Sequence, residues 1–184
     1  MYRVGGGECI EGVKTVVQTE QLGTGHAVMM ADDEISAEDT VVVLCGDTPL
    51  ISAETLKRFF DFHDKGGYAV TVLTTEVENP TGYGRVIRDK NKDLLKIVEQ
   101  KDANEEELAV SEINSGIYCF NGGFLKEALK KVGNDNAQGE YYLPDTIELI
   151  RLAGGKAGAF NGATIEELMG VNSRIQLANA ENLG

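Results

Sequence analysis

The sequence contains little of what an extracellular, membrane-spanning or zinc-binding protein needs. It has no tryptophan, three prolines and two histidines in 184 residues, and its three cysteines, Cys9, Cys45 and Cys119, form no CxxC pair. Widely spaced single cysteines favour reduced thiols in a cytoplasmic protein over a disulfide framework or a metal site. No apolar run approaches the ~20 residues of a membrane helix, and no signal peptide precedes the first expected strand.

Basic residues are also scarce. Lysine and arginine total 17 against 30 acidic residues, which gives a net charge of −13 with no basic cluster. Nucleic acid and anionic membranes are therefore poor partners. The sequence lacks GxSxG, HExxH, GxGxxG and GxxxxGK[ST], which disfavours covalent hydrolysis, zinc chemistry and the common phosphate loops. An acidic protein that handles an anionic substrate needs a cation in its site, which favours a divalent metal.

The most informative stretch runs from residue 18 to residue 49. Val41–Cys45 is apolar throughout, whereas a half-exposed strand would alternate, so we expect a strand covered on both faces in a parallel α/β sheet. Asp47 follows this strand, and ligands of open α/β sheets bind beyond the carboxyl ends of strands. The alternative for Asp47 is a residue that only forms the turn.

A glycine-containing turn lies upstream, where Gly23, Thr24 and Gly25 precede an apolar helix pattern over residues 24–31. Glycine permits close backbone approach, and free N–H groups at a helix start favour an anion or a carbonyl. A strand over residues 14–18 would deliver Gln18 to the same rim as Asp47. The alternative is an ordinary strand-to-helix connection.

The remaining pattern predicts alternating strands and helices. Ser52 caps a helix whose inward stripe is Leu56, Phe59, Phe60 and His63, and the polar turn DKNKD joins a hairpin that can form a lid over the crevice. The expected strands are residues 1–4, 14–18, 41–45, 68–75, 85–88, 94–99, 116–120 and 157–160. The expected helices are residues 24–31, 53–65, 124–131, 145–152 and 172–180.

The order of several motifs resembles a known family. QTEQLGTGHAV followed by VVVLCGDTPLIS is similar to the sugar-nucleotide pyrophosphorylases, specifically to the N-acetylglucosamine-1-phosphate uridyltransferase domain of a bifunctional bacterial enzyme. The resemblance continues through NPTGYGRVIR, IVEQKDA, EINSGIY, NAQGEYYLPD and GVNSRIQLA. It implies a Rossmann-like nucleotide-diphospho-sugar transferase fold, with a mixed, mostly parallel sheet flanked by helices. The family's GTRM-containing loop, its downstream lysine and its trimerising β-helix do not occur here. We therefore expect residues 1–184 to be a single, amino-terminally truncated domain.

The resemblance also implies a reaction and a set of site residues. UTP and N-acetylglucosamine 1-phosphate would give UDP-N-acetylglucosamine and pyrophosphate by in-line attack at the α-phosphate, assisted by Mg²⁺. Asp47 and Asn172 match the family's metal ligands, although Asn172 could instead cap a helix. Gln18, Gly23 and Thr24 match its uracil-contacting residues, Cys45 and Gly46 complete the segment before Asp47, and Gly84, Glu99 and Asn114 match its sugar-binding residues. A contact from Cys45 would be made by its backbone.

Several assignments stay open from the sequence. Tyr83, Arg85 and the NAQGEYYLPD loop could shape the acetamido pocket, whereas Arg85 could equally be a solvated hairpin charge. His26 suits a local hydrogen bond as well as catalysis. Two other functions compete with the uridyltransferase: a non-catalytic nucleotide-sugar-binding or assembly module, and a related pyrophosphorylase for another sugar or base. The whole family protein is expected to be a homotrimer.

Overall fold

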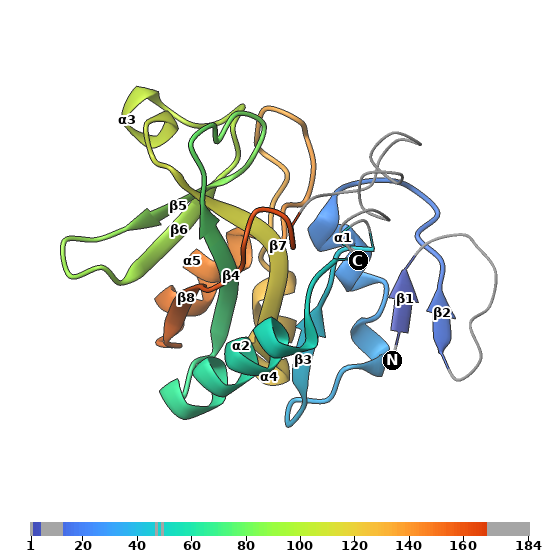
Figure 1. Ribbon diagram of the computed structural model, residues 1–184. Coiled ribbons are helices and arrows are strands. Elements are labelled where there is room, and N and C mark those ends of the chain that lie inside the picture. Colours follow the sequence, from blue (N-terminus) through green and yellow to red (C-terminus); the bar gives the residue numbers. More distant parts are fainter. Residues whose placement is uncertain (1, 5–12, 47, 49, 169–184) are drawn as a thin grey trace.

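The computed structural model describes residues 2–4, 13–46, 48 and 50–168 (Figure 1). The expected helix over residues 172–180 and the glycine turn at residues 5–7 lie outside this part. The strands are β1 (Tyr2–Val4), β2 (Lys14–Val16), β3 (Thr40–Val43), β4 (Val70–Glu76), β5 (Arg85–Arg88), β6 (Leu94–Val98), β7 (Glu112–Asn121) and β8 (Ala157–Asn161). The helices are α1 (Thr24–Met29), α2 (Ala53–Gly66), α3 (Glu105–Leu108), α4 (Gly122–Leu129) and α5 (Asp145–Leu152), with a 3₁₀ turn at Asp32–Glu34. None of these helices has the length and apolarity that a membrane crossing demands.

A mixed six-stranded sheet forms the centre of the molecule. Its order is β6-β5-β7-β4-β8, with β3 also paired to β7, while β1 and β2 form a separate parallel pair. The prediction of an α/β fold with a mixed sheet is confirmed. Within the described sheet, however, β7 runs antiparallel to β3, β4 and β5, so only the β4–β8 pair of neighbours is parallel. The sheet is therefore less parallel than the sequence predicts, because β7 lies between strands that run the opposite way.

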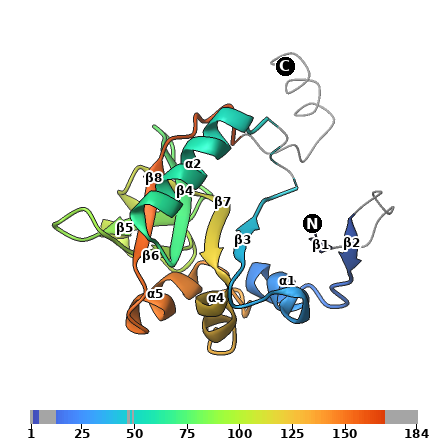
Figure 2. The ribbon, with the colours of Figure 1, turned by 90° about the horizontal axis from the view of Figure 1, so that it is seen from below.

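Helices cover both faces of the sheet. Figure 2 shows α2 on one side of β4, β7 and β8, and α4 with α5 on the other. Side chains of β7 alternate accordingly, since Tyr118 and Phe120 pack in the cluster that contains Leu125 of α4. Ile117 and Cys119 pack in the opposite cluster with Phe59 and Leu73. The period of two residues along a strand thus divides the core into two layers.

Strand β3 departs from the expectation of burial on both faces. Val41 and Val43 pack against the larger core cluster, but Val42 is 37% exposed and Leu44, just beyond the strand, is 43% exposed. Among the described strands β3 pairs only with β7, and α2 packs mainly against β4 and β8. The prediction that this strand is buried on both faces, which was made from its continuous apolar run, was therefore wrong. Exposed apolar edges of this kind favour association with other strands.

Helix α2 begins and ends as its sequence predicts. The Ser52 hydroxyl accepts a hydrogen bond from the Thr55 amide, and Gly67 ends the helix in the left-handed conformation. Phe59 and His63 are buried on the inner face, whereas Phe60 is exposed, so its place in the inward stripe was wrong. A residue next to Phe59 lies about 100° around the helix, which turns Phe60 toward solvent. His63 Nδ1 lies 2.8 Å from Thr71 Oγ1, and burial lowers the pKa of His63.

The hairpin of β5 and β6 belongs to the sheet. Val86, Leu94 and Ile97 are buried in the main core cluster, and β5 pairs with β7 at Ile113. The turn of the hairpin points away from α1 and β3 in Figure 1. The hairpin is confirmed, and its apolar side chains are part of the core; its role as a lid stays a prediction. Lys101 and Asp102, just beyond β6, contact the loop before α5.

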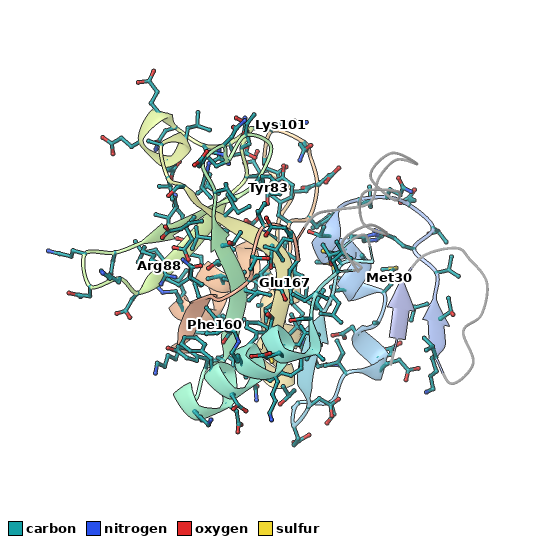
Figure 3. The ribbon with its side chains drawn as sticks, viewed as in Figure 1. Met30, Tyr83, Arg88, Lys101, Phe160 and Glu167 are labelled. Carbon is teal, nitrogen blue, oxygen red and sulfur yellow. The ribbon has the colours of Figure 1, made fainter. Side chains whose placement is uncertain are left out.

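A charged pair crosses one face of this sheet. Arg88 Nε and Nη2 each lie 2.7 Å from a carboxylate oxygen of Glu112, whose Oε1 also accepts from Thr74 Oγ1 at 2.6 Å. Arg88 Nη2 donates further to the carbonyl of Ala159 at 3.1 Å. Figure 3 places Arg88 beside the hairpin. These bonds connect β5, β7, β4 and β8, so the Arg88–Glu112 pair links four strands.

We predict that Glu112→Gln lowers the free energy of unfolding by about 1–3 kcal/mol, because the partly buried guanidinium of Arg88 loses its charged acceptor. Urea denaturation at pH 7 measures this change. Lys65→Met provides the control, since its pair with Asp61 is largely exposed and should contribute less than about 0.5 kcal/mol. Equal losses in the two variants would contradict a stabilising role for the buried pair.

Candidate functional site

Gln18, Gly23 and His26 meet at the start of α1. Gln18 Nε2 donates to the Gly23 carbonyl at 3.2 Å and lies 3.0 Å from His26 Nδ1. Gly23 has φ +105°, a conformation that favours glycine. The structure therefore brings the residues of the predicted base-binding group together, and adds His26 to them as a hydrogen-bonding partner.

The chain between residues 139 and 143 docks onto this turn. Gly25 N donates to the Tyr141 carbonyl at 2.7 Å, and Tyr141 N donates to the Leu22 carbonyl at 2.8 Å. Thr24 Oγ1 accepts from Leu143 N at 3.1 Å. These three bonds hold the amino end of α1 against a segment more than one hundred residues later in the sequence. Thr24 thus has a tertiary role besides any contact with a ligand.

The glycines of this turn permit the docking. A Cβ on Gly23 would lie 2.7 Å from the Tyr141 carbonyl oxygen, and one on Gly25 would lie 2.9 Å from the same atom. Both distances are too short for any larger residue unless the backbone moves. The sequence predicted a close approach by a ligand, and the structure shows a close approach by the protein's own backbone.

The predicted sugar-binding residues form a second group, which a series of contacts joins to Cys45. Cys45 Sγ donates to the Gly116 carbonyl at 3.4 Å, and Gly116 N donates to Asn114 Oδ1 at 2.9 Å. Asn114 N donates to the Gly84 carbonyl at 2.9 Å, and a Cβ on Gly84 would lie 3.0 Å from Glu99 Oε1. The structure therefore brings Gly84, Glu99 and Asn114 together near the carboxyl end of β3.

The carboxamide of Asn114 has a fixed orientation. Its Oδ1 accepts from the Tyr118 hydroxyl at 2.9 Å as well as from Gly116 N. Burial raises the pKa of Tyr118 well above its usual value, which keeps the hydroxyl protonated as a donor. With both bonds at Oδ1, the Asn114 Nδ2 group is left to donate elsewhere. Sequence reasoning missed Tyr118, because its position in an apolar strand suggests only a core residue.

Acidic side chains surround a hollow of about 280 Å³ beside Glu99. It is lined by Lys96, Ile97, Val98, Glu99, Asp102, Asp135, Asn136, Tyr142, Pro144, Asp145 and Glu148. Burial raises the pKa of Glu99, and the charges of Asp145 and Asp102 raise it further, while Arg85 opposes them. Burial, followed by Asp102 and Glu148, raises the pKa of Asp145 to about 6. Protons are therefore held more firmly here than on exposed carboxylates.

Arg85 is buried, so its interpretation as a solvated hairpin charge was wrong. It is 2% exposed, donates to the Tyr83 carbonyl, and lies 3.1 Å from Gln100 Oε1 through Nη2. Gln100 Oε1 also accepts from Gly82 N at 2.6 Å. Arg85 therefore stabilises the turn before β5, where Figure 3 labels Tyr83. Arg85 is the first residue of a polar hairpin, and this position in the sequence gave no sign that its side chain would be buried.

The loop that contains NAQGEYYLPD connects the two groups of residues. Ala137 N donates to Asp102 Oδ1 and Lys101 Nζ donates to Gln138 Oε1, each at 2.8 Å, so the loop contacts the open end of the hairpin. Its Tyr141 contacts the turn before α1. In Figure 1 this orange loop lies between the hairpin end and α1. One segment thereby fixes both predicted halves of the site.

The two predicted metal ligands, Asp47 and Asn172, lie outside the described residues. On one side of Asp47, Gly46 is exposed, and on the other Thr48 folds back so that its hydroxyl donates to the Cys45 carbonyl at 2.9 Å. In the part of the chain that the structure describes, no three histidine, cysteine or acidic side chains gather in a way that could hold a metal ion. The metal site therefore stays a prediction that rests on the sequence.

Replacing Gly23 by alanine should lower the free energy of unfolding by at least about 2 kcal/mol, since φ is positive and the new Cβ meets the Tyr141 carbonyl. Hydrogen exchange at the amides of Gly25 and Tyr141 should accelerate in the variant. Gly133→Ala is the control, because a Cβ there has open space and should change stability by less than about 1 kcal/mol. Unchanged protection of both amides in Gly23→Ala would refute the docking arrangement.

The raised pKa of Asp145 predicts that the free energy of unfolding depends on pH. In the native state Asp145 binds its proton more tightly than in the unfolded chain, where the value is 3.8, so stability falls as pH rises from about 4 to about 6. Asp145→Asn should gain about 1–2 kcal/mol relative to the wild type between pH 4 and pH 7, after allowance for solvent screening. Urea denaturation at several pH values measures the gain, with Asp61→Asn controlling for the loss of one negative charge. A gain that does not vary with pH would contradict the assignment.

The chain is similar to known proteins over most of its length. Over 173 residues the chain is 66% identical to the bifunctional protein GlmU of Clostridioides difficile, and 54% identical to that of Alkaliphilus metalliredigens. Each alignment covers 94% of this chain and 38% of the relative. The chain therefore spans well under half the length of the curated relatives that it matches.

The fold has solved relatives as well. A crystal structure of UDP-glucose pyrophosphorylase complexed with UDP-glucose superposes with a TM-score of 0.69, over 92% of this chain and 66% of that chain. Its sequence identity of 18% supports likeness of fold alone. The family model described as nucleotidyl transferase matches residues 4–164. Because that match includes both groups of site residues and most of the sequence, the chain belongs to the nucleotidyl transferase family.

Proposed function

We propose that this chain provides the base- and sugar-binding part of a uridyltransferase. The enzyme would convert UTP and N-acetylglucosamine 1-phosphate into UDP-N-acetylglucosamine and pyrophosphate. The observation that carries this proposal is the series of contacts through Cys45, Gly116, Asn114, Gly84 and Glu99. High identity to proteins named bifunctional GlmU supports it. The same relatives give no support to a purely non-catalytic binding module.

The chemistry requires positioning more than covalent work. An oxygen of the sugar phosphate attacks the α-phosphorus of UTP, the bond to the bridging oxygen breaks, and pyrophosphate leaves with that electron pair. Asn114 Nδ2 would donate to the sugar, and the Glu99 carboxylate would accept from a sugar hydroxyl. Gln18 and the backbone at Gly23 and Thr24 would contact uracil. Holding both substrates in one site lowers the entropic cost of their encounter.

Mg²⁺ fits the residues predicted to hold it. Asp47 and Asn172 offer carboxylate and carboxamide oxygens, which are donors that Mg²⁺ accepts, usually with substrate phosphates completing the shell. The net charge of −13 leaves a triphosphate in need of a cation. When bound, the metal would neutralise phosphate charge during the transfer. We further propose a cytoplasmic enzyme that is a homotrimer in its whole form.

The proposal predicts Mg²⁺-dependent binding of UDP-N-acetylglucosamine to this chain. Isothermal titration with and without Mg²⁺ should show an affinity at least about tenfold higher with the metal. Asp47→Asn should reduce the affinity in Mg²⁺ to the metal-free value, since it removes the negative oxygen donor. Asp61→Asn on α2 serves as the matched control.

Activity would be tested by pyrophosphate release from UTP and N-acetylglucosamine 1-phosphate, measured in a whole-length protein that contains this sequence. Absence of release there would refute the uridyltransferase assignment. Equal use of another sugar phosphate would instead favour a related pyrophosphorylase.

A further inference from the structure

The carboxamide of Gln18 can adopt only one of its two orientations. The Gly23 carbonyl already accepts the first helical bond of α1 from Ala27 N at 3.1 Å, and it also accepts from Gln18 at 3.2 Å. A carbonyl oxygen has no proton to donate, so the facing atom of Gln18 must be its nitrogen. The carboxamide oxygen then points away from this contact, and it has no partner among the described residues.

The tautomer of His26 follows from that orientation. Its Nδ1 lies 3.0 Å from the same Gln18 nitrogen, which is a donor. Nδ1 must therefore accept, which requires a neutral imidazole with its proton on Nε2. The His26 ring lies beside the Tyr141 ring, with 6.3 Å between centroids and a 32° tilt, in the segment that docks onto the turn. The His26 ring therefore contacts both Gln18 and Tyr141.

From these contacts we infer that His26 is a positioning residue that makes Gln18 selective for uracil over cytosine. With its nitrogen held by Gly23 and His26, Gln18 presents only an oxygen acceptor to a base. Uracil carries a donor at ring nitrogen N3, whereas N3 of cytosine is an acceptor that would repel this oxygen. The inference rests on the proposed function, because it takes Gln18 to contact the base.

A purely structural role for His26 makes different predictions. If His26 only stabilised the start of α1, its replacement would weaken folding and reduce the binding of all nucleotides alike. If it helps to fix the polarity of Gln18, its replacement removes one of the two acceptors that hold the Gln18 nitrogen. The reversed carboxamide, whose NH₂ group can meet N3 of cytosine, then becomes more populated. The ratio of two affinities distinguishes these roles, because a change in stability does not alter it.

The test begins with the tautomer. In ¹⁵N-labelled chain, long-range ¹H–¹⁵N spectra report both histidines, His26 and His63, and a His26 variant assigns the signals. We expect an unprotonated Nδ1 and a protonated Nε2 for His26. A proton on Nδ1 in the folded chain at neutral pH would overturn the inference directly, whether or not any nucleotide binds.

Nucleotide selectivity is then measured by titrating UTP and CTP, with Mg²⁺, into the wild type and two variants. His26→Phe keeps a ring beside Tyr141 but removes the acceptor, so the preference for UTP should fall roughly three- to tenfold, the value of one hydrogen bond. His26→Asn retains an oxygen that can take the place of Nδ1 and should keep most of the preference. If His26→Phe fails to fold, His26→Leu replaces it.

The outcomes separate this inference from the proposed function. A wild type that prefers UTP, together with a His26→Phe variant of equal preference, would overturn the role of His26 and leave the uridyltransferase proposal intact. A wild type that binds neither UTP nor UDP-N-acetylglucosamine would overturn the proposed function of this chain, and base selection with it.

Discussion

The backbone pairing between the turn at residues 22–25 and the segment at residues 139–143 is the constraint on which the site depends. It brings the start of α1, near the beginning of the chain, against the loop that leads into α5. The same loop contacts the end of the hairpin through Asp102 and Gln138. Two of the three bonds between the turn and the loop join backbone groups only, so they do not depend on the side chains of the loop. The close approach also explains two glycines in the turn, which a ligand alone would not require.

Much of the fold follows from local patterns in the sequence. The apolar run before Thr75 predicts a buried strand, and Ser52 with Gly67 predicts both ends of α2, because caps and strand periodicity act over a few residues. The direction of β7 could not be predicted in this way, since its pairing with β3 joins residues far apart in the chain. The continuous run in β3 was misread for the same reason, because exposure depends on which strand lies alongside.

The candidate site, like the fold, could be predicted only in part from the sequence. Motif resemblance identified Gly84, Glu99 and Asn114, which the structure brings together, while Asp47 and Asn172 lie outside the described residues. The supporting groups were missed, because each acts through its surroundings. Tyr118 orients Asn114 through a hydroxyl on a buried strand. Arg85 is buried by a turn that its own position does not reveal. Such roles depend on burial and geometry, which local sequence encodes only weakly.

The central place of β7 has a consequence for the order in which the protein can form. β7 is the shared neighbour of β3, β4 and β5, yet it follows all three in the chain. On a ribosome, these three strands emerge before their common partner has been synthesised. Until residue 121 has left the exit tunnel, the edges of these strands that pair with β7 in the native sheet have no partner, and such exposed edges readily associate with other chains. The topology therefore makes the nascent chain dependent on protection during synthesis, and it places the folding step late, when β7 joins the sheet.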